Sequence, residues 1–344
     1  MPVMLSSAVL AAAVPSSAPL STAGLWLTGA ARWLLLAGLS VALGGLAGRG
    51  LARQYKGPPG PAALPAPWAL RGSLLGLAAS ALLLVTAAAD PGLSARLARP
   101  RVLGLPPNAT ALIAAAEVAC FALAALLLRL QQSGWSVVPL LGVVAAEGLR
   151  SHPEGMIPAA GALLTYCHLL PAVLWAGMLL YTLRAAVSWR SDPAAMQGLI
   201  RFYGTAAAWL FAIVVITGLI SAALLVPLGS LLTTTYGRFL IVKAVLIAVT
   251  AGLAVAGRIW AARCRPRPGE GPPRAMRLEL AGLAAVLALA ALLTVLTPPA
   301  RPIYTAGLRA PLPAGGPAGR PLFAGPGTAA SPRIIASNSP NDRL

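Results

Sequence analysis

Charged residues are scarce in this chain of 344 residues: only 10% are Asp, Glu, Lys or Arg, and only eight are acidic. Hydrophobic residues make up 58% of the chain. A soluble core cannot hide so large a share of apolar side chains, which excludes a soluble globular protein. The composition predicts an all-α fold, a polytopic bundle of helices integral to a membrane.

Cysteine is also rare, and the chain has three cysteines. Because they are scattered and odd in number, they exclude a disulfide framework. The sequence lacks a phosphate-binding glycine loop and a nucleophile elbow. These absences argue against an ATP-driven pump and a hydrolase, so we expect no enzymatic activity. The net charge of +18 comes without a basic groove, which disfavours nucleic acid and favours anionic lipid headgroups as partners.

Eight apolar segments have, or nearly have, the roughly 17 to 25 residues that a membrane-spanning helix needs. They lie at residues 25–47, 69–89, 109–130, 136–150, 157–183, 202–226, 236–261 and 277–297, and the fourth is short. We divide the chain into an N-terminal segment (1–23), four spans (24–150), four further spans (151–299) and a tail (300–344). The tail is rich in Pro and Gly and is expected to be disordered. Segment 1–23 has a cleavage-like run but no basic start, so a cleaved signal and a retained segment both stay open.

Basic residues gather in the loops on one side of these spans. That side holds 14 of the 26 Lys and Arg residues, whereas the opposite loops hold five outside the tail. An excess of Lys and Arg is typical of cytoplasmic loops. The predicted orientation therefore places both termini outside.

Only two histidines occur, and one of them, His168, lies within the apolar run 165–178. An imidazole without a partner is costly in hydrocarbon, so we expect His168 to face a cavity or a polar partner. At 1.5 Å per residue it lies roughly 15 Å into its span, near the middle of the bilayer. His152 is expected at the outer mouth.

Four more ionisable residues fall in the outer halves of their predicted spans: Arg32, Glu117, Glu147 and Lys243. Two acids, two bases and a histidine can compensate one another, which is the condition for such groups to persist in lipid. This pattern predicts an outward-facing polar cavity.

Each of these residues also has a structural interpretation. Glu117 is either a proton acceptor or counter-ion to a metal, or the structural partner of Arg32 or Lys243, and both interpretations stay open. Lys243 is expected to hold a carboxylate ionised. Glu147 is expected to pair with Arg150 at a helix end.

Two further residues have structural expectations. Glu279 is expected to pair with Arg277 or to reach the headgroups. Cys167 is expected to be ordinary helix packing, because adjacent helix positions point about 100° apart and it therefore does not share the face of His168.

Several short motifs follow one another in the second half of the chain. Ser151-His152 precedes His168-Leu169-Leu170-Pro171-Ala172-Val173-Leu174-Trp175-Ala176-Gly177, and then come Thr217-Gly218, Leu232-Thr233-Thr234-Thr235-Tyr236-Gly237-Arg238, Lys243, Arg277-Leu278-Glu279 and Thr297-Pro298-Pro299. Over residues 147–299 the sequence resembles the copper-resistance protein D (CopD) family. The resemblance implies a bacterial inner-membrane protein of copper homeostasis that works with a periplasmic copper carrier of the CopC type.

The side chains at hand are compatible with copper. Imidazole, thiolate and thioether suit Cu(I), whereas imidazole, carboxylate and water suit Cu(II), so the oxidation state stays open. We predict metal ligands at His168 in mid-membrane and at His152 and Met156 at the mouth, with Glu117 and Glu147 as further candidates.

Three functions remain open on the sequence. The favoured function is to take copper from the extracytoplasmic side into or across the membrane. The second is a scaffold or assembly factor that handles copper without transporting it. The third is a haem or quinone redox protein, which is weakened because paired histidine ligation needs two histidines at facing depths.

Overall fold

The computed structural model describes residues 22–55, 64–89, 109–150, 158–263 and 268–295, and the regular elements in these ranges are helices. The α-helices are α1 (Thr22–Leu39), α2 (Gly45–Gln54), α3 (Ala69–Ala89), α5 (Ala109–Arg129), α6 (Val137–Leu149), α7 (Pro158–Ser188), α8 (Pro193–Leu225), α9 (Thr235–Arg263) and α10 (Arg274–Val295). A π-helical turn, Ser40–Gly44, joins α1 to α2, and a 3-10 turn, Leu228–Ser230, follows α8.

Seven helical segments of the described chain are long and apolar enough to cross a membrane, with α1, the π-helical turn and α2 counted as one. The eighth, α6, has 13 residues and is therefore about 20 Å long. The prediction of a polytopic helical membrane bundle is confirmed, whereas α6, at the predicted fourth span, is shorter than the helices that can cross a membrane. The tail at 300–344 and nearly all of segment 1–23 lie outside the described residues.

Several helices extend beyond their predicted spans, α7 and α8 among them. α7 continues to Ser188 rather than residue 183, and α8 begins at Pro193 rather than residue 202. The Asp192 carboxylate caps α8 by accepting the Ala195 N–H at 3.0 Å, and Pro193 occupies the first turn, where its missing N–H costs nothing. Hydropathy marks the apolar length of a helix, so it misses polar turns that continue beyond that length.

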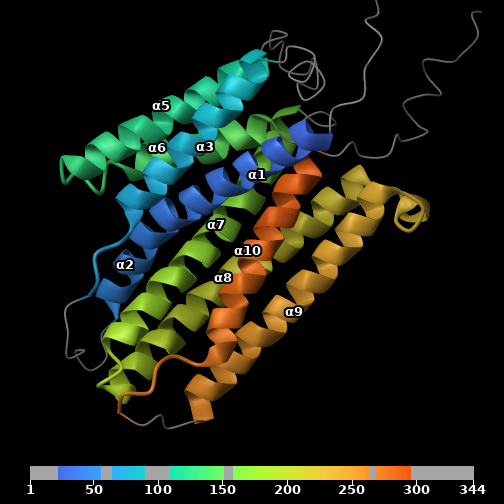
Figure 1. Ribbon diagram of the computed structural model, residues 1–344. Coiled ribbons are helices and arrows are strands. Elements are labelled where there is room, and N and C mark those ends of the chain that lie inside the picture. The colour runs from blue at the N-terminus through green and yellow to red at the C-terminus, as the bar shows by residue number, and fades with distance from the viewer. Residues whose placement is uncertain (1–21, 56–63, 90–108, 151–157, 264–267, 296–344) are drawn as a thin grey trace, which may run out of the picture. The chain divides into compact units, whose positions relative to one another are not determined.

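Helix α7 lies at the centre of the bundle, where it contacts α2, α6, α8, α10 and the π-helical turn (Figure 1). α3 and α5 pack against each other on one flank, and α9 lies on the other flank beside α10. α1 also runs along α10, so helices from both halves of the chain share one interior.

The backbones of α7 and the π-helical turn meet at two glycines. A Cβ placed on Gly177 would collide with the carbonyl oxygen of Ser40 and would lie 2.7 Å from the Cα of Gly44. Small residues at such crossings let membrane helices approach closely, and van der Waals packing then drives their association. The contact sets how α7 seats against the first membrane span.

Loops that carry basic residues meet at one end of the bundle. The Arg184 guanidinium lies 3.9 Å from the centre of the Trp68 ring, which joins the end of α7 to the segment before α3. The Gly269 N–H donates to the Arg190 carbonyl at 2.8 Å, which joins the loops before α8 and before α10. These contacts place the predicted cytoplasmic loops side by side.

We expect Gly177→Ala to lower the free energy of unfolding by about 1 to 3 kcal/mol, because the added methyl group meets backbone that cannot move aside. Thermal unfolding of the purified protein in detergent measures the effect. The matched control is Gly252→Ala in α9, where an added Cβ meets no atom within 4 Å. Equal unfolding midpoints for the two variants would contradict the close packing at Gly177.

The orientation is tested by labelling single cysteines in a variant whose three native cysteines are replaced by alanine. Arg190 and Leu232 are exposed at opposite ends of α8. Because basic loops are retained in the cytoplasm, a membrane-impermeant maleimide added to intact cells should label Leu232→Cys and spare Arg190→Cys. The reverse pattern would invert the topology.

Candidate functional site

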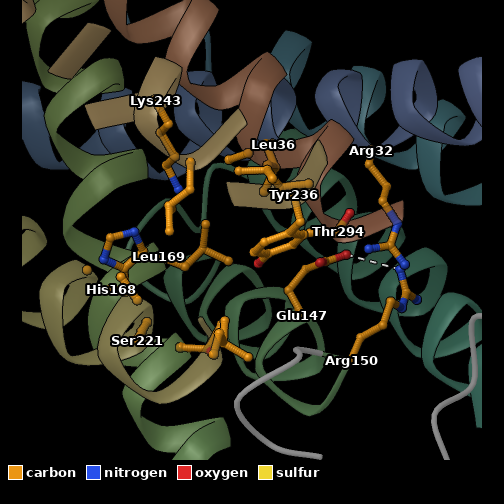
Figure 2. A pocket seen from close by; sticks show the side chains of 17 residues that line it. Arg32, Leu36, Glu147, Arg150, His168, Leu169, Ser221, Tyr236, Lys243 and Thr294 are labelled. Atoms are coloured by element: carbon orange, nitrogen blue, oxygen red, sulfur yellow. Dashed lines mark hydrogen bonds and ion pairs between the residues drawn. The ribbon is translucent and has the colours of Figure 1, made fainter. Parts of the chain in front are cut away.

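A cavity of about 180 Å³ lies between α1, α6, α7, α8, α9 and α10, at the end of the bundle where α8 ends and α9 begins. Its polar lining consists of Arg32, Glu147, Arg150, Thr165, His168, Ser221, Tyr236, Lys243 and Thr294. In Figure 2, His168 and Lys243 lie on one side of the cavity, and Arg32, Arg150 and Glu147 lie on the other. Four of the five ionisable residues predicted to face inward, Arg32, Glu147, His168 and Lys243, line this cavity.

The His168 ring is oriented by a threonine of α8. Its Nδ1 lies 3.0 Å from the Thr217 hydroxyl oxygen. The Thr217 hydroxyl donates its own proton to the Ile213 carbonyl at 2.6 Å, so it accepts a hydrogen bond from Nδ1–H. An imidazole protonated on Nδ1 keeps its lone pair on Nε2, which is the nitrogen left for a ligand in the cavity. A fixed ring with a free nitrogen is what metal coordination by histidine requires.

Gly218, the next residue of α8, makes room for that ring. A Cβ placed there would lie 3.1 Å from Cε1 and 3.6 Å from Nδ1 of His168. The sequence showed Thr217-Gly218 only as a motif, and the structure gives each residue a role: Thr217 bonds the imidazole and Gly218 accommodates it. Cys167 is exposed and does not line the cavity, so it does not share the face of His168.

The opposite side of the cavity is organised by Arg150. Its Nη2 donates to Glu117 Oε2 and its Nη1 donates to Glu147 Oε1, both at 3.1 Å. The Arg150 and Glu117 side chains are 3% and 0% exposed, so this charge cluster is removed from solvent. The predicted pair of Glu147 with Arg150 is confirmed. The structural partner of Glu117 is also Arg150, and the expectation of Arg32 or Lys243 as that partner is wrong, because the end of α6 brings Arg150 back against α5.

Two bases of the cavity lack a carboxylate partner among the residues that the structure describes. Within the described ranges, neither Arg32 nor Lys243 has an acidic oxygen at ion-pair distance, and the buried Arg32 Nε has no hydrogen-bond acceptor. Figure 2 shows the Lys243 ammonium pointing into the cavity near His168. The prediction that Lys243 holds a carboxylate ionised is therefore wrong for the described chain, where Arg150 has that role.

The predicted metal ligands do not all meet. His168 and Glu147 line the cavity, whereas Glu117 lies behind Arg150 and is not part of the lining. His152 and Met156 lie outside the described residues. Among the side chains that the structure describes, no group of three His, Cys, Asp or Glu residues converges as a complete metal site would require.

A second polar cluster lies near the other end of the bundle. Glu279 is 3% exposed, and its Oε1 accepts a hydrogen bond from Trp175 Nε1 at 3.0 Å. Tyr203 and Arg258 line the same small pocket. Arg277 is exposed, so the expectation that Glu279 pairs with it or reaches the headgroups is wrong. One turn of sequence context cannot show that α10 turns Glu279 toward α7.

Comparison with known protein families gives a match over the last three helices. Residues 197–296 match the model of the CopD family, copper resistance protein D. Over these helices the chain is similar to the CopD family. No curated protein and no solved structure matches the chain.

The CopD match is narrower than the resemblance over 147–299, since it covers α8 to α10 and leaves α7 with His168 outside. The CopD helices nevertheless supply Thr217, Gly218 and Lys243, the residues that seat or face His168. The helices identify a multi-pass membrane protein, and its last three helices resemble a family of copper resistance proteins.

We expect Arg150→Met to destabilise the protein by about 3 to 5 kcal/mol, because it leaves Glu117 and Glu147 buried without a counter-charge. Thermal unfolding in detergent measures the loss. Adding Glu117→Gln to that variant should restore part of the stability, since one uncompensated charge is then removed. Arg238→Met, which removes an exposed charge from the start of α9, is the control. A loss no larger than that of the control would show that the ion pairs are not structural.

Proposed function

We propose that this protein takes copper from the extracytoplasmic side of a bacterial inner membrane and binds it in the cavity at His168. The observation that carries the proposal is the hydrogen bond from His168 Nδ1 to Thr217, which leaves Nε2 available to a metal. Imidazole suits both Cu(I) and Cu(II). His152 and Met156, by their place in the sequence ahead of α7, are proposed to capture the ion first.

In this proposal, the two carboxylates near the cavity do not bind the metal. Glu117 and Glu147 both accept hydrogen bonds from Arg150, and a carboxylate engaged by a buried guanidinium is a poor ligand for a cation. We therefore infer that they neutralise Arg150 and hold it in the wall. The protein is not an enzyme in this proposal, since copper is bound and moved without chemical conversion.

Family resemblance supplies the expected partner, a periplasmic copper carrier of the CopC type, which would deliver copper at the cavity end. At the opposite end, Arg49 and Arg53 line a groove of about 440 Å³ with leucines of α2, α6 and α7. Guanidinium groups beside apolar side chains suit anionic lipid headgroups, whose acyl chains can follow the leucines. This supports the proposed anionic lipid surroundings.

One observation favours a second function, a scaffold that holds copper and passes it on without transport. Trp175 lies two turns along α7 from His168, is 3% exposed, and packs edge to face against Phe211 with ring centres 5.6 Å apart. These rings fill the interior beyond the cavity. Copper would then leave toward the side from which it came.

His168→Ala should abolish copper binding and copper uptake by vesicles while leaving the protein folded, because the cavity loses its free ring nitrogen. Bound copper is measured on purified protein, and uptake in reconstituted vesicles. Thr217→Val should weaken binding by about 10 to 100-fold by releasing the ring, and Thr217→Ser should restore it.

The matched control is Cys167→Ala, the exposed neighbour on the same helix, which should bind copper normally. Copper binding unchanged in His168→Ala would refute the cavity as the copper site. If His168→Ala loses copper binding and the wild type itself shows no copper uptake, the scaffold function is favoured. Absorption bands of haem in the purified protein would favour a redox function over both copper functions.

A further inference from the structure

The cavity offers few ligands to a metal ion. His168 supplies one ring nitrogen, and the uncharged polar groups of the lining are the hydroxyls of Thr165, Ser221, Tyr236 and Thr294. The carboxylate of Glu147 lies on the opposite side, bound to Arg150. Copper in proteins prefers several nitrogen, sulfur or carboxylate ligands, and hydroxyl groups are weak substitutes. An ion held at His168 therefore needs a ligand that the described residues do not provide.

The charge of the cavity is also unusual for a cation site. Three permanent bases, Arg32, Arg150 and Lys243, line it, against the carboxylates of Glu147 and of Glu117 behind Arg150. With all five groups ionised, the described wall carries one net positive charge. On the His168 side the charged side chain is Lys243, whose ammonium points into the cavity.

A bare copper ion at His168 would be repelled by that lysine. Two like charges a few ångströms apart in a partly buried site change a binding constant by more than tenfold. The lysine is instead placed to attract a negative ligand at the histidine. A cavity of about 180 Å³ has room for an ion together with a small anion, since water occupies about 30 Å³ in the liquid.

We propose that copper occupies this cavity as a complex with a small anion such as a halide, with His168 bound to the metal and Lys243 paired with the anion. The inference rests on the proposed function and names the form in which its substrate binds. The anion completes the coordination that the protein lacks. It also neutralises the charge that would otherwise oppose binding.

The test measures Cu(I) binding to the purified full-length protein, without oxygen, by competition with a chromophoric chelator. Nitrate is replaced by chloride at constant ionic strength, so that general screening does not change. Binding by the wild type should strengthen about tenfold or more in chloride after correction for the chloride complexes of free Cu(I). Lys243→Met should lose this dependence, and Lys243→Arg should retain it.

X-ray absorption at the copper edge gives a second readout that does not depend on affinity. With bromide in place of chloride, the wild type should show bromide directly bound to copper beside nitrogen. Lys243→Met, loaded at saturating copper, should show less bromide or none. Arg238→Gln, which removes an exposed charge from the same helix, is the control and should behave as the wild type.

Three outcomes would overturn the anionic complex while leaving copper binding at His168 in place. The first is wild-type binding that is equal in nitrate and chloride, together with tighter binding by Lys243→Met. The second is release of one proton per copper bound, lost in Lys243→Met, which would mean that lysine gives up its charge. The third is loss of binding in Glu154→Gln, because an acid outside the described residues would then balance Lys243. Binding that survives His168→Ala would instead refute the proposed function.

Discussion

Arg150 is the charge on which the cavity depends. It reaches one carboxylate on α5 and another on α6, all three side chains are withdrawn from solvent, and hydrocarbon offers no water to replace any of them. Removing the arginine would leave two buried anions, and removing both acids would leave a buried cation. These ion pairs hold the end of α6 against α5. On this side of the cavity, the charges of Arg150 and the two carboxylates therefore compensate one another.

On the opposite side of the cavity, the charge of Lys243 and the Nε2 atom of His168 remain available to a ligand. Thr217 fixes the His168 ring but uses only one of its nitrogens, and Lys243 enters the cavity with no acidic partner in the described chain. Groups that are costly in a membrane and left unsatisfied are typical of functional sites. The carboxylates on the Arg150 side are already paired, whereas the His168 side has groups free to bind a ligand. We therefore assign ligand binding to the His168 side.

Much of the architecture could be predicted because the bilayer imposes it. A span must be long and apolar, which made the helices recognisable, and an imidazole or carboxylate must turn inward, which placed His168, Glu117 and Glu147 correctly toward the interior. The pair of Glu147 with Arg150 was predictable because both lie within one turn of chain. The contact of Glu117 with Arg150, 33 positions apart, was not.

The sequence by itself determined that the chain is a helical membrane bundle, which residues face its interior and which loops share a side, because length, apolarity and charge asymmetry act on each segment separately. The tertiary structure alone decided the partners: Arg150 for Glu117, Thr217 for His168 and Trp175 for Glu279. The helical period gives the angle between residues of one helix, but not the rotation of that helix against its neighbours. That rotation depends on packing between helices, such as the approach of Gly177 to Gly44, which no local pattern records.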